Sequence, residues 1–169
     1  DPAPPLRVVL QVSDRAKLLL VDDRPENLLA LEAILEPVDA DLVRAASGEE
    51  ALRRLLHEEF AAILLDVQMP GMDGFQTAEL IKQRERTKTV PVIFLTSLER
   101  MEDQVKGLEV GAVDYLTKPV HPRVLATRVA NQLRIKEAAD VLRDRDSWLR
   151  DEVARRTQDV ERTQEVAIL

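Results

Sequence analysis

Residues 61–74 read AAILLDVQMPGMDG and give the best starting point for predicting the fold. Five apolar residues, 61–65, are followed by proline and glycine turn formers, a pattern typical of a strand buried on both faces of a parallel sheet. Asp66 would then lie at the carboxyl end of that strand, where open α/β sheets place their functional groups. Aspartate also begins many ordinary turns, so this stretch alone leaves a purely structural role for Asp66 open.

Strands and helices alternate on both sides of this stretch. The expected strands are residues 17–21, 41–45, 61–65, 91–95 and 113–116, and the helices between them cover residues 25–36, a segment capped by Ser47, 74–86 and 99–110. Such alternation predicts right-handed crossovers and a parallel sheet with helices on both faces. We therefore expect an α/β fold with a doubly wound five-stranded parallel sheet of the flavodoxin-like order 2-1-3-4-5.

The composition excludes several classes of function. Hydrophobic residues make up 45% of the 169 residues and aromatic residues only 3%, which suits an aliphatic core of helices on a sheet. The net charge of -7 and the lack of a basic block argue against direct nucleic-acid binding. The absence of cysteine excludes disulfides and thiolate chemistry. No apolar run reaches the roughly 18 residues that span a bilayer, so we expect a cytoplasmic protein without membrane contact.

The two ends of the chain differ from its middle. Residues 1–16 hold several prolines and are expected to form a leader, with one further candidate strand at residues 6–12. After Pro122 the sequence contains neither proline nor glycine, so a single long helix can run toward the end of the chain. The expected organisation is a leader at 1–16, one domain at 17–136 and an extended helical linker at 137–169.

The expected linker carries an apolar stripe within a highly charged helix. The members of the stripe recur at spacings of seven and four, as in a coiled-coil seam, and they are Leu142, Leu149, Val153, Val160 and Ala167. Three polar residues interrupt the same stripe, namely Asp146, Arg156 and Thr163. A solvated single helix is the alternative, although a lone helix this charged buries little apolar surface. We expect a parallel coiled coil and hence a homodimer through the last helix, with Trp148 near the seam or packed on a neighbouring element.

Acidic residues also end the first expected strand. Asp22 and Asp23 follow that strand, which in the expected order lies beside the strand that ends in Asp66. Three carboxylates in one place repel each other unless they are protonated or share a cation. Because the cluster offers oxygen ligands without histidine or cysteine, it favours Mg²⁺. His57 and His121 lie elsewhere in the sequence and are expected to be surface or packing residues.

A hydroxyl group and an ammonium group complete this edge of the predicted sheet. Thr96 follows the fourth expected strand, and Lys118 follows the fifth. A carboxylate beside Mg²⁺, with a hydroxyl and a lysine facing it, suits attack on a transferable phosphoryl group. Asp66 would be the nucleophile and form an acyl phosphate, while Mg²⁺ and Lys118 neutralise charge on the phosphoryl oxygens. No general base is needed, because an aspartate is already ionised at neutral pH.

Four motifs together resemble the receiver domain of two-component response regulators. They are VDD at residues 21–23, LLDVQMPGMDG from Leu64, FLTS from Phe94 and GAVDYLTKP from Gly111. The motifs agree jointly in order and spacing, over about residues 17–136. The resemblance implies a CheY-like fold and a regulatory domain that is not itself an enzyme. It also implies that Asp66 receives a phosphoryl group from a sensor histidine kinase.

The same resemblance implies roles for individual residues. The implied ligands of Mg²⁺ are Asp23, Asp66 and the backbone carbonyl of Gln68, with Asp22 acting through water. Lys118 would pair with the acidic site, and the peptide bond between Lys118 and Pro119 is expected to be cis.

Thr96 and Tyr115 match the family's switch pair. On phosphorylation of Asp66, the threonine hydroxyl would move toward the phosphoryl group and the ring of Tyr115 would enter the space it leaves. A half-buried strand aromatic is the simpler role for Tyr115. Gln68 and Leu98 occupy positions that tune hydrolysis of the acyl phosphate in this family, and we expect Leu98 to shield it from water.

The stretch LRDEVARRTQDVERTQEVAIL, residues 149–169, resembles the linker that joins receivers to HD-GYP cyclic di-GMP phosphodiesterase domains. Similar helices precede diguanylate cyclase and histidine kinase domains, so these outputs also stay open. A receiver-like dimerisation module that is never phosphorylated is a further alternative, and a small phosphatase with an aspartyl nucleophile is another. The phosphatase is disfavoured because such enzymes usually carry an acidic residue at the place of Gln68.

Overall fold

A computed structural model describes residues 15–168 of the chain, and the candidate strand at residues 6–12 therefore lies outside the described residues. The strands are β1 (Ala16–Val21), β2 (Ala40–Ala45), β3 (Ala62–Leu65), β4 (Val92–Thr96) and β5 (Asp114–Thr117). The helices are α1 (Pro25–Leu35), α2 (Gly48–His57), α3 (Gly74–Gln83), α4 (Met101–Val110) and α5 (Pro122–Ile168). Each strand lies within one residue of its predicted bounds.

The five strands form one sheet in the order β2-β1-β3-β4-β5, and every neighbouring pair is parallel. This confirms the predicted α/β fold and its strand order. The central strand β3 is buried along its whole length, as a strand covered on both faces must be. The order places β1 and β3 side by side. This is the switch point of the sheet, because β2 is added on one side of β1 and the later strands are added on the other.

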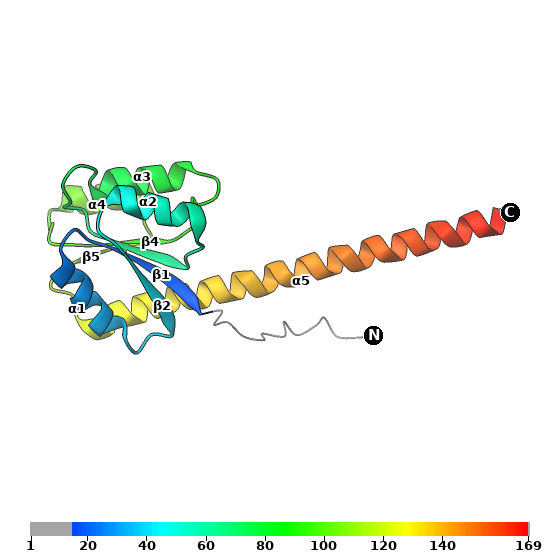
Figure 1. The fold of residues 1–169 in the computed structure, drawn as a ribbon, viewed down its shortest axis with the longest axis horizontal. Helices are drawn as coiled ribbons and strands as arrows, with labels where there is room; N and C mark the ends of the chain where they lie inside the picture. The colour runs from blue at the N-terminus through cyan, green and yellow to red at the C-terminus, as the bar shows by residue number, and fades with distance from the viewer. Residues whose placement is uncertain (1–14, 169) are drawn as a thin grey trace. The chain divides into compact units, whose positions relative to one another are not determined.

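Two apolar layers cover the two faces of the sheet. One layer joins the sheet to α2 and α3 and includes Phe60, Phe75 and Phe94. The other joins the opposite face to α1 and to the first turns of α5, which contribute Leu125 and Val129. Figure 1 shows α2, α3 and α4 on one side of the strands and α1 on the other. The side chains on the two faces alternate along the strands, so consecutive leucines of β1 enter different layers.

Two helices are shorter than their periodicity predicts. Helix α3 ends at Gln83 rather than at residue 86, because Arg84 adopts an extended backbone conformation and Thr87 Oγ1 donates a hydrogen bond to the Ile81 carbonyl. Helix α4 begins at Met101 rather than at residue 99, and Arg100 before it is also extended. In both cases the loop satisfies backbone groups that a longer helix would have used.

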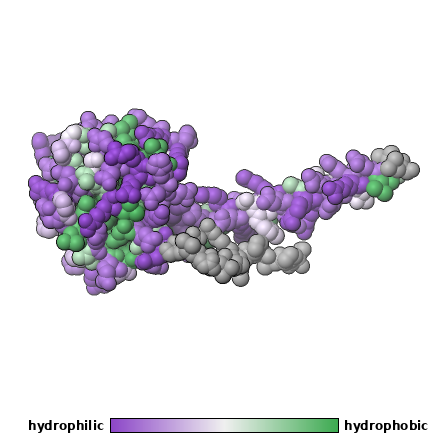
Figure 2. Space-filling view, in the orientation of Figure 1, coloured by the Kyte–Doolittle hydropathy of each residue, from purple (hydrophilic) through white to green (hydrophobic). Residues whose placement is uncertain are grey.

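The chain divides into two compact units among the described residues. Arg15–Leu133 form the first, which contains the sheet and the start of α5, and residues 134–168 belong to the second. In the second unit the apolar residues of the predicted seam are open to solvent, with Leu142 60% and Val153 63% exposed. Hydrophilic side chains cover most of this part of α5 (Figure 2). Within residues 15–168, no helix combines the length and the apolar character that a bilayer span requires.

Candidate functional site

The carboxyl ends of β1 and β3 bring two carboxylates to the same edge of the sheet. Val21 pairs with Leu65 in the register of the two strands, so Asp22 and Asp66 leave the sheet at the same level. The Asp66 amide donates to the Val21 carbonyl at 3.0 Å, which continues the ladder by one residue. Both side chains are buried, with only 1% of Asp22 and 8% of Asp66 exposed. Two buried carboxylates this close require a positive partner.

Lys118 supplies that positive partner. Its Nζ lies 3.2 Å from Asp22 Oδ2 and 3.3 Å from Asp66 Oδ2, so one ammonium group bonds both acids. The lysine follows β5, and its amide donates to the Thr96 carbonyl at 2.8 Å. The peptide bond between Lys118 and Pro119 is cis. The side chain therefore reaches from one edge strand across the carboxyl ends of the sheet to its centre.

Asp22 is held by the loop and first turn that follow it. One carboxylate oxygen accepts from the Arg24 amide at 3.0 Å, and the other accepts from Asn27 Nδ2 at 3.1 Å. Asn27 thus belongs to the site, although the sequence analysis did not identify it. A signal was present, since an amide side chain in the first turn of a helix that follows Asp22 faces back toward the strand end.

Asp66 lies in an environment that opposes its negative charge. Burial raises the pKa of Asp66 above its ordinary value, and the nearby charge of Asp22 raises it further. Lys118, the Gln68 amide and the Thr96 hydroxyl act against this shift, because each stabilises the ionised form. The Gln68 amide donates to Asp66 Oδ1 at 3.1 Å, while the Gln68 side chain is exposed.

Asp23 does not join the other two acids through any hydrogen bond or ion pair that we observe, and its side chain is half-buried. In the described chain, residues 15–168, no three or more histidine, cysteine, aspartate or glutamate side chains form a group arranged to hold a metal ion. The structure thus brings Asp22 and Asp66 together around Lys118, and the oxygen-only character of this pair fits Mg²⁺, which needs only one or two carboxylates beside its waters. His57 ends α2, and His121 precedes α5, where its Nδ1 accepts a hydrogen bond from the Arg123 amide at 3.1 Å.

Thr96 and Tyr115 lie on the neighbouring strands β4 and β5. Thr96 is fully buried, and its Oγ1 accepts a hydrogen bond from the Leu98 amide at 3.4 Å. The Tyr115 hydroxyl donates to the Leu98 carbonyl at 3.0 Å. Burial raises the pKa of Tyr115 to about 12, with smaller contributions from the charges of Asp103 and Asp66, so its hydroxyl is a donor at neutral pH. Leu98 therefore connects the two residues through its own backbone.

Comparison with known proteins identifies the family. The sequence profile of the response regulator receiver domain matches residues 18–130, which is more than half of the chain. The chain belongs to the response regulator receiver domain family. This confirms the resemblance drawn from the four motifs. Receiver domains accept phosphoryl groups from histidine kinases, and they typically bind Mg²⁺ at the acidic site.

Three similar proteins place this receiver domain among its relatives. A Vibrio cholerae protein named "Probable cyclic di-GMP phosphodiesterase" is 36% identical over 151 residues, which cover 89% of this chain and 34% of that protein. Response regulator PleD of Caulobacter vibrioides is 39% identical over 132 residues, 78% of this chain and 29% of that protein. The crystal structure of chemotaxis protein CheY4 of Vibrio cholerae has 31% identity and a TM-score of 0.65 over 69% of this chain and 98% of that chain.

The extent of these matches differs in an informative way. This receiver domain spans about a third of the length of the two curated relatives, so their other parts have no counterpart in it. The match with the Vibrio protein covers 151 of the 169 residues, so it leaves out 18. The segment after the family profile, residues 131–169, is longer than that. The match with the Vibrio protein therefore includes part of α5 beyond residue 130.

Proposed function

We propose that Asp66 accepts a phosphoryl group from the histidine of a sensor kinase. The observation that carries the proposal is the contact of one ammonium group, that of Lys118, with both Asp22 and Asp66. In the transfer, an ionised oxygen of Asp66 forms a bond to phosphorus while the bond from phosphorus to the kinase's histidine nitrogen breaks. Lys118 would neutralise charge on the phosphoryl oxygens during this exchange.

The acidic residues at this edge fit a magnesium ion, which would supply charge neutralisation for the phosphoryl group. Asp23 and Asp66 would hold the ion through carboxylate oxygens, Gln68 would do so through its backbone carbonyl, and Asp22 would act through a water molecule. Oxygen ligands from one or two carboxylates and a carbonyl are the set that Mg²⁺ prefers in proteins. Asn27 supports this role because its amide fixes the orientation of the Asp22 carboxylate.

Burial prepares Asp66 for attack on phosphorus. A desolvated carboxylate with a raised pKa is more basic than one in water, and its ionised form is the better nucleophile. The Thr96 hydroxyl, which favours the ionised form of Asp66, can turn to an oxygen of the incoming phosphoryl group. The neighbouring Lys118 and the Gln68 amide hold the carboxylate in one orientation during the reaction.

The switch would run from Thr96 to Tyr115. When Thr96 moves toward a phosphoryl group on Asp66, its bond with the Leu98 amide changes, and the Leu98 carbonyl that holds Tyr115 changes with it. The face formed by α4, β5 and α5 would repack between two discrete arrangements rather than deform smoothly.

The chain would pass this change to an output through α5. We propose a receiver at residues 17–136 and a helical linker at 137–169 that pairs with a second copy as a parallel coiled coil. The exposed seam residues Leu142, Leu149, Val153 and Val160 support pairing, since a second helix would remove them from water. The proposed output is an HD-GYP cyclic di-GMP phosphodiesterase domain, supported by the match with the Vibrio protein, which continues into α5.

Acetyl phosphate provides a test that needs no kinase. The chain is incubated with acetyl phosphate and Mg²⁺, and its intact mass is measured with and without a chelator of divalent cations. The proposal expects a mass gain of one phosphoryl group that the chelator abolishes and that Asp66→Asn lacks. An unchanged mass in the native chain would favour a receiver-like module that is not phosphorylated.

A further inference from the structure

Helix α4 approaches the sheet through a glycine. Among the residues of α4, only Gly107 is buried. A Cβ atom built at this position would lie 2.8 Å from Tyr115 Cδ2 and 3.0 Å from Phe94 Cδ2. Carbon atoms in folded proteins pack at about 3.5–4.0 Å, so a side chain here has no room. The space that Gly107 leaves is filled by the ring of Tyr115.

The ring of Tyr115 is the last member of a chain of contacts that starts at Thr96. The Thr96 hydroxyl, which favours the ionised form of Asp66, accepts a hydrogen bond from the Leu98 amide at 3.4 Å. The Leu98 carbonyl in turn accepts the Tyr115 hydroxyl at 3.0 Å. The Tyr115 ring lies against Phe94 with ring centroids 5.8 Å apart and planes tilted by 52°. Gly107 therefore lies beside the end of a series of contacts that begins at Thr96, on the strand next to the one that carries Asp66.

We infer that Gly107 is a positioning residue, whose missing side chain keeps the Tyr115 ring beneath α4 with its hydroxyl on the Leu98 carbonyl. A methyl group at position 107 would push the ring outward and break that hydrogen bond. The inference deepens the proposed function, since it names the feature of α4 that sets the position of the Tyr115 ring shown by the structure. The role of the ring in signalling rests on the proposed function, whereas the position of the ring beside Gly107 does not.

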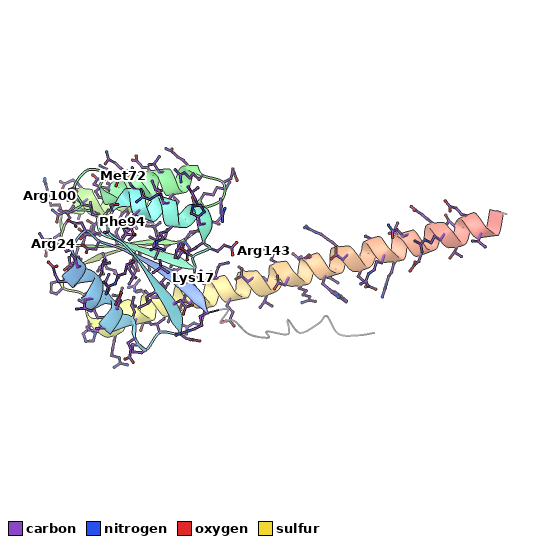
Figure 3. The ribbon with its side chains drawn as sticks, in the orientation of Figure 1. Lys17, Arg24, Met72, Phe94, Arg100 and Arg143 are labelled. Atoms are coloured by element: carbon purple, nitrogen blue, oxygen red, sulfur yellow. The ribbon has the colours of Figure 1, made fainter. Side chains whose placement is uncertain are left out.

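The ring of Tyr115 is the part that would move. Phe94, labelled in Figure 3, is fully buried in the layer between the sheet and the helices, and Phe75 packs against it edge-on. Tyr115 is half-buried on the edge strand β5, so its ring can turn toward solvent about its χ1 bond. Alanine also favours the helical conformation more than glycine does, which opposes any unwinding of α4.

The single tyrosine of the sequence allows a direct test. The chain is labelled with [13Cζ]tyrosine, and its one tyrosine resonance is recorded for the native chain, Gly107→Ala and Leu108→Ala, all unphosphorylated. Leu108 neighbours Gly107 in α4 but is 51% exposed, so its variant is the matched control. The expected result is a resonance near that of solvent-exposed tyrosine in Gly107→Ala and a native resonance in Leu108→Ala. A native resonance in Gly107→Ala would overturn the inference.

A stability cycle provides a second test that does not depend on the chemical shift. Urea unfolding midpoints are compared for the native chain, Gly107→Ala, Tyr115→Ala and the double variant. If the methyl group added by Gly107→Ala destabilises the fold by displacing the Tyr115 ring, this substitution lowers the urea midpoint of the native chain. In the Tyr115→Ala background, which has no ring, the same substitution leaves the urea midpoint unchanged or raises it. The same shift in both backgrounds would contradict the inference. Neither test involves phosphorylation, so their failure is distinguishable from failure of the proposed role of Asp66.

Discussion

Lys118 Nζ lies 3.3 Å from Asp66 Oδ2, although 52 residues separate the two in the chain. The contact exists because β3 and β5 are parallel strands of one sheet, which brings their carboxyl ends to a common edge. The same ammonium group also bonds Asp22, so the removal of any one of these three side chains changes the charge balance of the other two.

Asp66→Asn is expected to stabilise the receiver domain at neutral pH. The folded-state pKa of Asp66 is raised, chiefly by burial, so the ionised form is destabilising. The folded state binds the proton more tightly than the unfolded state, and stability therefore falls as pH rises from the ordinary aspartate pKa through the raised one. Urea unfolding should show a higher midpoint for Asp66→Asn at pH 7. The difference in midpoint between Asp66→Asn and the native chain should narrow at pH values below the raised pKa of Asp66. A difference that is the same at all pH values would contradict the raised pKa.

Leu98→Glu is expected to shorten the lifetime of the proposed acyl phosphate by roughly tenfold, equivalent to about 1.4 kcal/mol in the barrier. Leu98 is half-buried, packs against the apolar layer and follows Thr96 by two residues, where it can keep water from the phosphoryl group. A glutamate there would admit and orient water. The lifetime is measured by intact mass after removal of acetyl phosphate. Leu108→Glu, which places the same residue on the exposed face of α4, is the control and should keep the native lifetime.

Leu142→Asp is expected to weaken self-association by at least about tenfold. A leucine buried in a helix pair contributes about 1.5–3 kcal/mol, and a charge at that position costs more. Val141→Asp is a matched control, since Val141 and Leu142 are 62% and 60% exposed and only Leu142 lies on the stripe. Sedimentation equilibrium gives the dissociation constants. Equal effects of the two variants would argue against the seam, and a monomeric native chain would refute the dimer.

Gly74→Ala is expected to destabilise the fold by about 1–3 kcal/mol, as overpacking of a tight contact does. A Cβ at position 74 would lie 2.2 Å from the Asp66 carbonyl oxygen and 2.7 Å from Val67 Cα, so the backbone that carries Asp66 would have to move. The Gly74 amide also donates to the Val67 carbonyl at 2.8 Å. Urea unfolding measures the loss. Glu79→Ala, on the exposed face of the same helix, should leave the stability within about 0.5 kcal/mol of the native value.

The sequence predicts the sheet well because its signals are local. Apolar runs such as residues 61–65 indicate buried strands. The run 61–65 is followed by Asp66, whose carboxylate can bind a metal ion or act as a nucleophile. Asp22, Asp66 and Lys118 could be expected at one edge because strand order follows from the alternation of elements.

Features that depend on tertiary contacts escaped prediction. Helical periodicity carries α3 to residue 86, but Lys82 Nζ donates to the carbonyls of Lys88 and Val90 and fixes a loop there instead. The role of Asn27 depends on how α1 leaves β1, and the space beside Gly107 depends on where α4 meets the sheet. Contacts of this kind join residues whose spacing carries no periodic signal.

The most direct test of the account asks which atom carries the phosphoryl group. The chain is treated with acetyl phosphate and Mg²⁺, the acyl phosphate is reduced with borohydride, and peptides are sequenced by mass spectrometry. Borohydride converts a phosphorylated aspartate to homoserine, so the product marks the site. The account predicts homoserine at position 66 alone. Homoserine at another aspartate, or at none while the same treatment marks a known receiver domain, would contradict it.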